Sequence, residues 1–417
     1  MNTISQKLQP LKKENRILFL DILRGIAILF IFTANIPYLS GYFMLSDEQI
    51  QTFSTAKFDE YFDFVMFTLV DGKFYSIFSL LFGIGFVIQF NNLKKHNLPF
   101  VPFFRKRMFW LLLIGLCHLF FIWIGDILTL YALLGFVLIL FRNHTDKQLL
   151  KWSVILIIFP VFHWLFIYIT EWNYPNAVFG LYGQYWESLN LPMQDFGNGN
   201  VRPNEAYFFG TTSLQEFFKI KLGRPLLRLG MILNEGRAFK VLGIFLIGIW
   251  SGRKILNENI LSDSKLLKKI ALWGFIIGLP VSIFRTTIDF FIEGNHFWEF
   301  MNYVTYALGT VPLAIAYTAS VALACQNKTT ILKWFAPVGQ MALSSYIFQT
   351  FISVFIFHGI GLGHRGEFSF SAIIAITIGI FIVQILFCRW WLSKFKYGQL
   401  EWVWRQLTYG KFITLKK

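Results

Sequence analysis

Charged residues are scarce in this sequence of 417 residues. They make up 15% of it, against the roughly 25% that is usual for a soluble domain. Apolar residues supply 55% and aromatic residues 19%, including 50 Phe and 14 Trp. Large apolar side chains in such numbers suit helices that face lipid better than one core surrounded by water. The shortage of charge therefore excludes a soluble fold and predicts an integral membrane protein.

Cysteine is also scarce, and its placement excludes a thiolate metal site. Cys117, Cys325 and Cys388 lie in or beside apolar runs and lack the spacing of metal ligands. We expect them to be small buried apolar residues. We also expect no metal and no tightly bound cofactor.

The positive charge does not indicate a nucleic-acid partner. The formal net charge is +15, but Lys and Arg gather in short segments between apolar runs. That placement is typical of the flanks of transmembrane helices. We therefore predict membrane lipids as partners and no nucleic acid.

Ten apolar runs of near-spanning length follow one another along the chain. They are Leu18–Ile36, Lys73–Phe90, Met108–Ile124, Ile127–Phe141, Trp152–Ile169, Phe239–Trp250, Ile270–Phe290, Tyr303–Ala324, Pro337–His358 and Ser371–Trp391. The fourth and sixth runs are short, so they could be tilted or partly interfacial. The expected fold class is all-α, a polytopic membrane helical bundle of about ten transmembrane helices.

The runs and the gaps between them divide the chain into five parts. We expect a cytoplasmic N-terminal tail (1–17), a first transmembrane half of five helices (18–170), and a long extracytoplasmic loop (171–238). A second transmembrane half of five helices (239–391) and a basic, aromatic cytoplasmic tail (392–417) follow. Lys and Arg fill alternate short gaps, which predicts that both termini are cytoplasmic.

The long loop contains a basic amphipathic stretch, SLQEFFKIKLGRPLLRLGMIL. Its cations are Lys219, Lys221, Arg224 and Arg228. A helix of this composition is typical of the membrane interface. We expect it to lie flat on the outer surface of the bilayer.

The first predicted helix carries a polar stripe. Asp21 and Arg24 are three residues apart and can pair, and Asn35 lies about three turns further along the same face. One interpretation is a structural ion pair with an Asn that joins helices. The other is a phosphate or substrate site at Arg24. Both interpretations remain open at this point.

Three further polar residues are predicted near Asn35 in the outer half of the bilayer: Lys73, His118 and Asp126. We interpret them as one polar site, in which Asp126 orients His118 for proton transfer. Alternatively, Lys73 snorkels outward and His118 is a structural hydrogen-bonding group. Direct contact between His118 and Asp126 requires the helix to end near Trp123–Gly125, because a continuous helix would separate them.

Other intramembrane polar groups are weaker candidates. His163 and the Arg285/Asp289 pair are interpreted as structural. The loop HGIGLGHRG, which contains His358 and His364, lacks the strand and the GK[ST] ending of a phosphate loop.

Five segments carry a resemblance to a known family. They are LDILRGIAILFIFTANI, DGKFYSIFSLLFGIGF, IGLCHLFFIWIGDILTLYALLG, GQMALSSYIFQTF and FKYGQLEWVWRQLTYGK, in order between residues 20 and 411. They resemble the YeiB-type family, bacterial membrane proteins with a domain of unknown function. The resemblance covers essentially the whole chain. It implies a multi-pass protein of the bacterial cytoplasmic (inner) membrane.

The segment LRGIA…N is also similar to the first helix of the wider transmembrane acyltransferase superfamily. That superfamily includes acyltransferase family three and the lysosomal heparan glucosaminide acetyltransferase. In acyltransferase family three a His occupies the position of Asn35. Because Asn cannot act as a base, we expect His118, with Asp126, to take the catalytic role.

The resemblance implies transfer of an acyl group from a cytoplasmic acyl-CoA-like co-substrate to an extracytoplasmic acceptor. Arg24 and the inner basic loops would face the donor phosphates, with Asp21 beside Arg24 in the same substrate-binding set. Asn35 and Lys73 would stabilise the oxyanion. A transporter or exporter of a small or lipidic solute is one alternative, although no internal repeat is visible. A non-catalytic membrane subunit is the other. No sequence feature indicates an oligomeric state.

Overall fold

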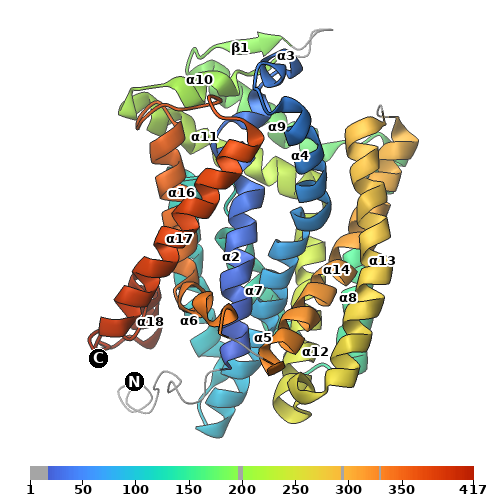
Figure 1. Cartoon of the computed structure of the whole chain (residues 1–417), viewed down its shortest axis with the longest axis vertical. Coiled ribbons are helices and arrows are strands. Elements are labelled where there is room, and N and C mark those ends of the chain that lie inside the picture. The colour runs from blue at the N-terminus through green and yellow to red at the C-terminus, as the bar shows by residue number, and fades with distance from the viewer. Residues whose placement is uncertain (1–16, 196–200, 293–294, 328–329) are drawn as a thin grey trace.

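The chain forms a bundle of long helices in its computed structural model (Figure 1). The structure describes residues 17–195, 201–292, 295–327 and 330–417. The expected all-α class is confirmed, with one short antiparallel hairpin, β1 (Met193–Asp195) and β2 (Val201–Pro203), as its β-structure within those residues. The expected N-terminal tail, 1–17, lies outside the described residues except for Ile17.

The helices of the first half are α2 (Leu18–Leu39), α3 (Asp47–Gln51), α4 (Ala56–Val70), α5 (Lys73–Lys95), α6 (Phe100–Phe121), α7 (Leu128–Leu138) and α8 (Asp146–Thr170). Around the β hairpin lie α9 (Tyr174–Ser188), α10 (Glu205–Gly210) and α11 (Leu214–Asn234). The rest are α12 (Arg237–Asn257), α13 (Ser264–Phe291), α14 (His296–Asn327), α15 (Ala336–Gln340), α16 (Ala342–Phe357), α17 (Phe370–Lys394) and α18 (Gln399–Tyr409).

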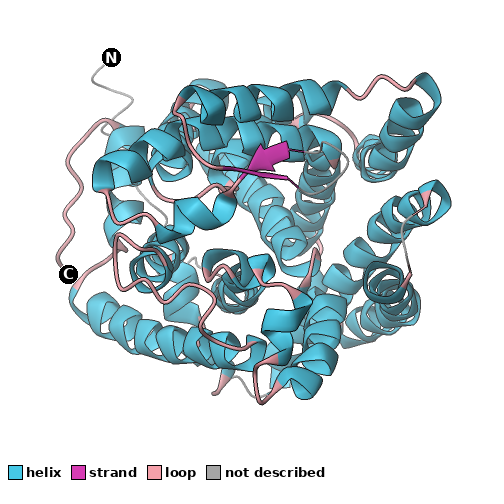
Figure 2. Cartoon of the chain, turned by 90° about the horizontal axis from the view of Figure 1, so that it is seen from above, coloured by secondary structure: helices cyan, strands magenta, loops and turns pink. Residues whose placement is uncertain are grey.

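The bundle has two distinct ends. The hairpin end, at the top of Figure 1, carries β1, β2 and α10, and the tail end carries α18 and the C-terminus. Seen from above, many helices are viewed end-on or obliquely, and the β hairpin lies across the hairpin end (Figure 2). The helix axes therefore run largely between these two ends.

Helix α2 runs through the middle of the bundle and contacts α5, α15, α16 and α17. Its apolar side chains, including Leu23, Ala27 and Ile36, are completely buried. Such complete burial is expected of a helix that is apolar on nearly all sides.

Two glycines allow α2 and α15 to touch through their backbones. A Cβ atom on Gly25 would lie 2.1 Å from the carbonyl oxygen of Phe335. A Cβ atom on Gly339 would lie 1.8 Å from the carbonyl oxygen of Asp21. Both glycines belong to the segments that carry the family resemblance, so this crossing gives those positions a physical reason.

The predicted count of ten membrane spans is not confirmed. Within the described residues, six stretches are long and apolar enough to cross a bilayer: Leu18–Met44, Ala56–Lys95, Asp146–Thr170, Ser264–Phe291, His296–Gln326 and Phe370–Lys394. A seventh span would be the pair Leu332–Gln340 and Ala342–Phe357, which is bent by 87°. The run predicted over Pro337–His358 is therefore broken at Met341.

The remaining predicted runs, in α6, α7 and α12, are too charged or too short to count as membrane spans. Helix α6 carries Arg105, Lys106 and Arg107 as its sixth to eighth residues, and α12 carries cations near both ends. Helix α7 has 11 residues, or about 16 Å of rise against a hydrocarbon thickness of roughly 30 Å.

Helix α11 packs with its basic face inward, and its expected position flat on the outer surface of the bilayer stays a prediction. Three of its four basic side chains point inward: Lys221, Arg224 and Arg228 are 1%, 5% and 7% exposed. Its apolar residues Phe218 and Leu222 are exposed instead. The basic face therefore packs into the protein, and the apolar face is the one that lies on the surface.

The cysteines behave differently from one another. Cys388 is buried, as expected, and Cys325 is half-buried. Cys117 is exposed on α6, so its predicted burial is wrong. An apolar run indicates a membrane helix but does not indicate which side of the helix faces the protein.

The α2–α15 crossing predicts that Gly339→Ala destabilises the protein by about 1–3 kcal/mol or more, because the added methyl group meets backbone that cannot rotate away. The measurement is thermal unfolding in detergent, followed by tryptophan fluorescence. Gly379→Ala is the matched control, since nothing lies within 4 Å of a Cβ at that helical position. Equal unfolding temperatures for the two variants would contradict the tight crossing.

Candidate binding cavity

A cavity of about 1460 Å³ extends through the bundle. Its lining reaches from Tyr38 and Glu205 toward the hairpin end to Arg107 and Trp404 at the tail end. Typical small-molecule sites occupy roughly 300–1,000 Å³. The cavity is therefore large enough for an extended amphiphile or for two smaller reactants.

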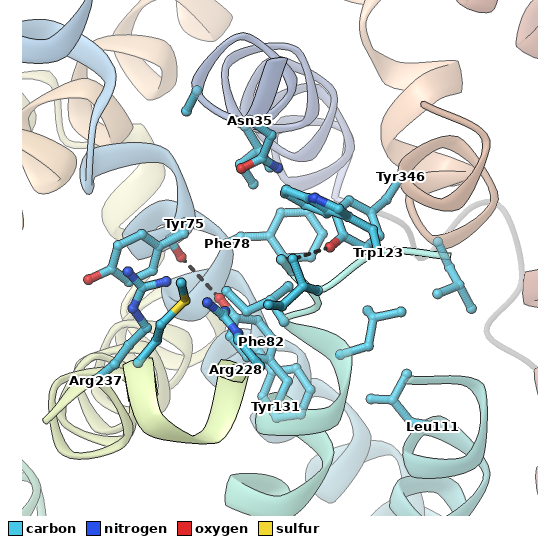
Figure 3. A pocket seen from close by; sticks show the side chains of 18 of the residues that line it. Asn35, Tyr75, Phe78, Phe82, Leu111, Trp123, Tyr131, Arg228, Arg237 and Tyr346 are labelled. Atoms are coloured by element: carbon cyan, nitrogen blue, oxygen red, sulfur yellow. Dashed lines mark hydrogen bonds between the residues drawn. The ribbon is translucent and has the colours of Figure 1, made fainter. Parts of the chain in front are cut away.

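The middle of the cavity is apolar. Figure 3 shows Phe78, Phe82 and Leu111 lining this part. Other apolar lining residues are Ile28, Ile31, Phe74, Leu81, Phe86 and Met108. A surface of this kind suits an acyl chain, which gains free energy from leaving water.

The tail end of the cavity is cationic. Arg24 donates to Asp21 at 3.0 Å, and both side chains line the cavity. The guanidinium of Arg107 lies 3.7 Å from the centre of the Trp404 ring. Arg405 completes this set, so three guanidinium groups border the tail end.

A carboxylate from α18 caps the broken span at the same end. Glu401 accepts hydrogen bonds from the backbone N–H groups of Leu343 and Ser344, at 2.7 and 3.1 Å, and from the Ser344 hydroxyl. Burial raises the pKa of Glu401, although these hydrogen bonds act in the opposite direction. The carboxylate satisfies N–H groups that the bend at Met341 would otherwise leave unpaired.

Toward the hairpin end, the inward face of α11 contributes a second set of cations. Arg224 pairs with Glu205, and Arg237 of α12 pairs with Glu235. The Arg228 Nη2 donates to the carbonyl oxygen of Asp126 at 3.1 Å. Figure 3 shows Arg228 and Arg237 directed toward the same part of the cavity, near Tyr75.

The predicted contact between His118 and Asp126 is present. Helix α6 ends at Phe121, and the following turn brings the Asp126 Oδ1 to 2.9 Å from the His118 Nδ1. Asp126 also accepts the backbone N–H groups of Leu128 and Thr129, at 3.2 and 2.7 Å. It therefore orients the imidazole and caps the start of α7 at the same time.

The six predicted site residues separate into two groups. Asp21, Arg24 and Asn35 line the cavity, whereas His118, Asp126 and Lys73 do not. The side chain of His118 is completely buried, and its Nε2 has no hydrogen-bond partner among the described residues.

Tyr346, which lines the cavity, adjoins His118. The two ring centres are 5.1 Å apart, and the Tyr346 hydroxyl donates to the carbonyl oxygen of Gly125 at 3.2 Å. Trp123 and Leu128 line the cavity beside it. His118 thus belongs to the layer directly behind the cavity wall.

Lys73 does not snorkel outward, so this alternative from the sequence analysis is wrong. It is 1% exposed, and its Nζ donates to the carbonyl oxygen of Phe67 at 3.4 Å. The adjacent Asp71 pairs with Arg285 at 2.8 Å. His163 bonds to the hydroxyl of Tyr174. Arg285 and His163 therefore make contacts that join helices, which suits the structural interpretation.

Sequence reasoning missed the cavity-lining role of Lys221, Arg224, Arg228 and Tyr346. The signal for the α11 cations was available, because they follow one another on one helical face opposite Phe218 and Leu222. The sequence predicts that this amphipathic stretch lies flat on the outer surface of the bilayer and does not specify that its basic face packs against the protein. The same amphipathic pattern also fits a helix whose basic face packs against the protein and whose apolar face lies on the surface.

These features define a polytopic helical membrane protein with an amphipathic internal cavity. Comparison with known proteins assigns its family. Residues 251–411 match the family described as "Protein of unknown function (DUF418)". The chain is 31% identical to the uncharacterized protein YxaH of Bacillus subtilis, over 98% of both chains. It is 25% identical to the uncharacterized protein YeiB of Escherichia coli, over 81% of both. The chain therefore belongs to this YeiB-type family of unknown function. No solved structure matches it.

The double role of Asp126 predicts that Asp126→Ala is costly. Loss of an exposed helix cap typically costs about 1 kcal/mol, and a buried group left without its partner adds about 1–3 kcal/mol. The control is Asp263→Ala, which removes an exposed cap from the Leu266 N–H of α13. Thermal unfolding in detergent should show the larger loss for Asp126→Ala and an intermediate one for Asp126→Asn. Equal losses at positions 126 and 263 would contradict the role in the buried pair.

Proposed function

We propose that this protein is a membrane-embedded acyltransferase that accommodates a phosphate-bearing acyl donor and its acceptor in one cavity. The observation that carries the proposal is the continuity of the cavity between the tail-end cations and the polar groups nearer the hairpin end. Two reactants that enter from opposite ends can meet in such a space, which converts a bimolecular encounter into a positioned one.

The donor is an acyl-CoA-like thioester in this proposal. Arg24, Arg107 and Arg405 bind its phosphates, because guanidinium groups match phosphate oxygens in charge and geometry. The acyl chain extends into the apolar middle between Phe78 and Phe82. The tail end is then cytoplasmic and the hairpin end extracytoplasmic, in the bacterial inner membrane, as the distribution of Lys and Arg favours.

His118 is the general base of the reaction. Its Nδ1 faces the Asp126 carboxylate, which favours the tautomer with the proton on Nδ1 and leaves the Nε2 lone pair available. Nε2 takes the proton of the acceptor hydroxyl or amine as the new acyl bond forms. The thioester C–S bond then breaks, and the departing thiolate receives that proton. Asn35 donates to the oxyanion, whereas Lys73 has no access to the cavity and is left out of this role.

Access to His118 is the critical step of this mechanism. Tyr346 lines the cavity and its ring lies 5.1 Å from the His118 ring, so a rotation of Tyr346 must accompany acceptor binding. The complete burial of His118 favours the competing interpretation, a non-catalytic subunit in which the His118–Asp126 pair is structural. A transporter is favoured by a different observation, the presence of cations toward both ends of the cavity.

The test uses purified protein in proteoliposomes supplied with acetyl-CoA or palmitoyl-CoA, and it measures release of the free CoA thiol. We expect release by the unaltered protein and a loss of about 100-fold or more in His118→Gln, the usual effect of removing a general base. His96→Gln is the control, because His96 is exposed at the end of α5.

The alternatives give different results in the same preparation. Full CoA release by His118→Gln, or none by well-folded unaltered protein, would reject the acyltransferase. Entry of labelled acyl-CoA into the vesicles without thiol release would favour the transporter.

A further inference from the structure

Three cations of α11 lie on one helical face that points into the protein. Lys221, Arg224 and Arg228 are separated by three and four residues, the spacing that places side chains above one another on a helix. All three line the cavity and are more than nine-tenths buried. A buried cation is costly unless an anion compensates it.

Only part of this charge is compensated within the described residues. Glu205 pairs with Arg224, but Lys221 and Arg228 form no salt bridge with a carboxylate of the described residues. Their acceptors are neutral backbone carbonyls, of Ile122 for Lys221 and of Asp126 for Arg228. The Asp126 carboxylate is directed to His118 and the start of α7 instead. Within the part of the chain that the structure describes, the cations Lys221 and Arg228 therefore lack an anionic partner.

Several buried nitrogen atoms at the same place also lack a hydrogen-bond partner in the described part of the chain. They are the Nε atoms of Arg224 and Arg228 and both ring nitrogens of His358. His358 is 2% exposed, stacks 4.3 Å from the Phe209 ring, and lines the cavity. Buried donors of this kind are normally satisfied, so their grouping beside a cavity indicates a missing acceptor.

We propose that Lys221, Arg224, Arg228 and His358 form a binding site for the phosphate of an amphiphile. A phosphate monoester carries a charge of about −1.5 to −2 near neutral pH, which matches the two uncompensated cations. Its oxygens accept hydrogen bonds from several directions, as the separated donors require. The attached chain extends into the apolar middle of the cavity.

This inference deepens the proposed function and rests on it for one point, that the phosphate-bearing amphiphile is the acceptor. The binding itself does not require transfer. The same phosphate chemistry could come from a lipid headgroup or from a soluble phosphate ester, so the experiment includes both sources.

The experiment measures binding to the full chain in dodecyl maltoside by thermal stabilisation. The probes are phosphatidic acid, diacylglycerol with the same chains, and inorganic phosphate. We expect phosphatidic acid to stabilise the protein and diacylglycerol to have little effect. Arg228→Gln should weaken phosphatidic acid binding at least about tenfold, since a buried hydrogen bond to a charged group is lost. Lys219→Gln, on the exposed face of the same helix, should leave it unchanged.

Inorganic phosphate identifies the source of the ligand. Displacement of phosphatidic acid by inorganic phosphate supports a site that accepts the phosphate group alone. Failure to displace it supports a lipid site that also requires the chains.

Two results would overturn the proposal. One is equal stabilisation of the unaltered protein by phosphatidic acid and diacylglycerol, which needs no variant and so cannot arise from misfolding. The other is an unchanged affinity in Arg228→Gln that elutes as a single folded species. The binding experiment contains no acyl donor, so it tests the phosphate site separately from acyl transfer. Binding of phosphatidic acid together with no CoA release in the transfer assay would reject the acyltransferase and leave this site in place.

Discussion

The turn between α6 and α7 leaves backbone carbonyls inside the bundle without helical hydrogen bonds. The structure around the cavity depends on the side chains that donate to these carbonyls. Non-helical backbone at membrane depth is tolerated only where protein groups or water replace the missing hydrogen bonds. Lys221 donates to the carbonyl of Ile122, Tyr346 to that of Gly125, and Arg228 to that of Asp126. One turn thus receives side chains from both α11 and α16.

The same turn determines where the polar groups lie. Because α6 ends at Phe121, Asp126 can reach back to His118 and cap α7. Because the carbonyls need donors, the basic face of α11 points inward and brings its cations to the cavity. The exposed Phe218 and Leu222 on the opposite face are then suited to lipid. A break in one helix is therefore linked to the orientation of another helix about a hundred residues away in the sequence.

Much of the architecture could be predicted from the sequence, because hydropathy reports length and apolar character directly. The runs that correspond to α2, α8, α13, α14 and α17 are all candidate spans in the structure. The run over Pro337–His358 was predicted as one helix, but the chain bends by 87° within it. No proline lies between Gly339 and Ser345 to mark a helix break there, so the bend depends on tertiary partners: the close contact of Gly339 with Asp21 and the cap from Glu401.

The candidate site was predictable only in part, for a related reason. Asp21 and Arg24 are close in sequence, so their pairing follows from helical spacing. The contact between His118 and Asp126 depended on a helix end that Gly125 made plausible. The inward orientation of Arg228 and the burial of Lys73 depend on which helix packs against which face. A single sequence contains no direct signal for that choice.

In our proposal the cavity holds a phosphate-bearing amphiphile. The most direct measurement is an electron cryo-microscopy structure of the protein in lipid nanodiscs containing phosphatidic acid. We expect density in the cavity, with a phosphate beside Arg228 and Lys221 and a chain beside Phe78 and Phe82. A cavity closed by side chains, or an amphiphile with no phosphate at the α11 cations, would contradict it.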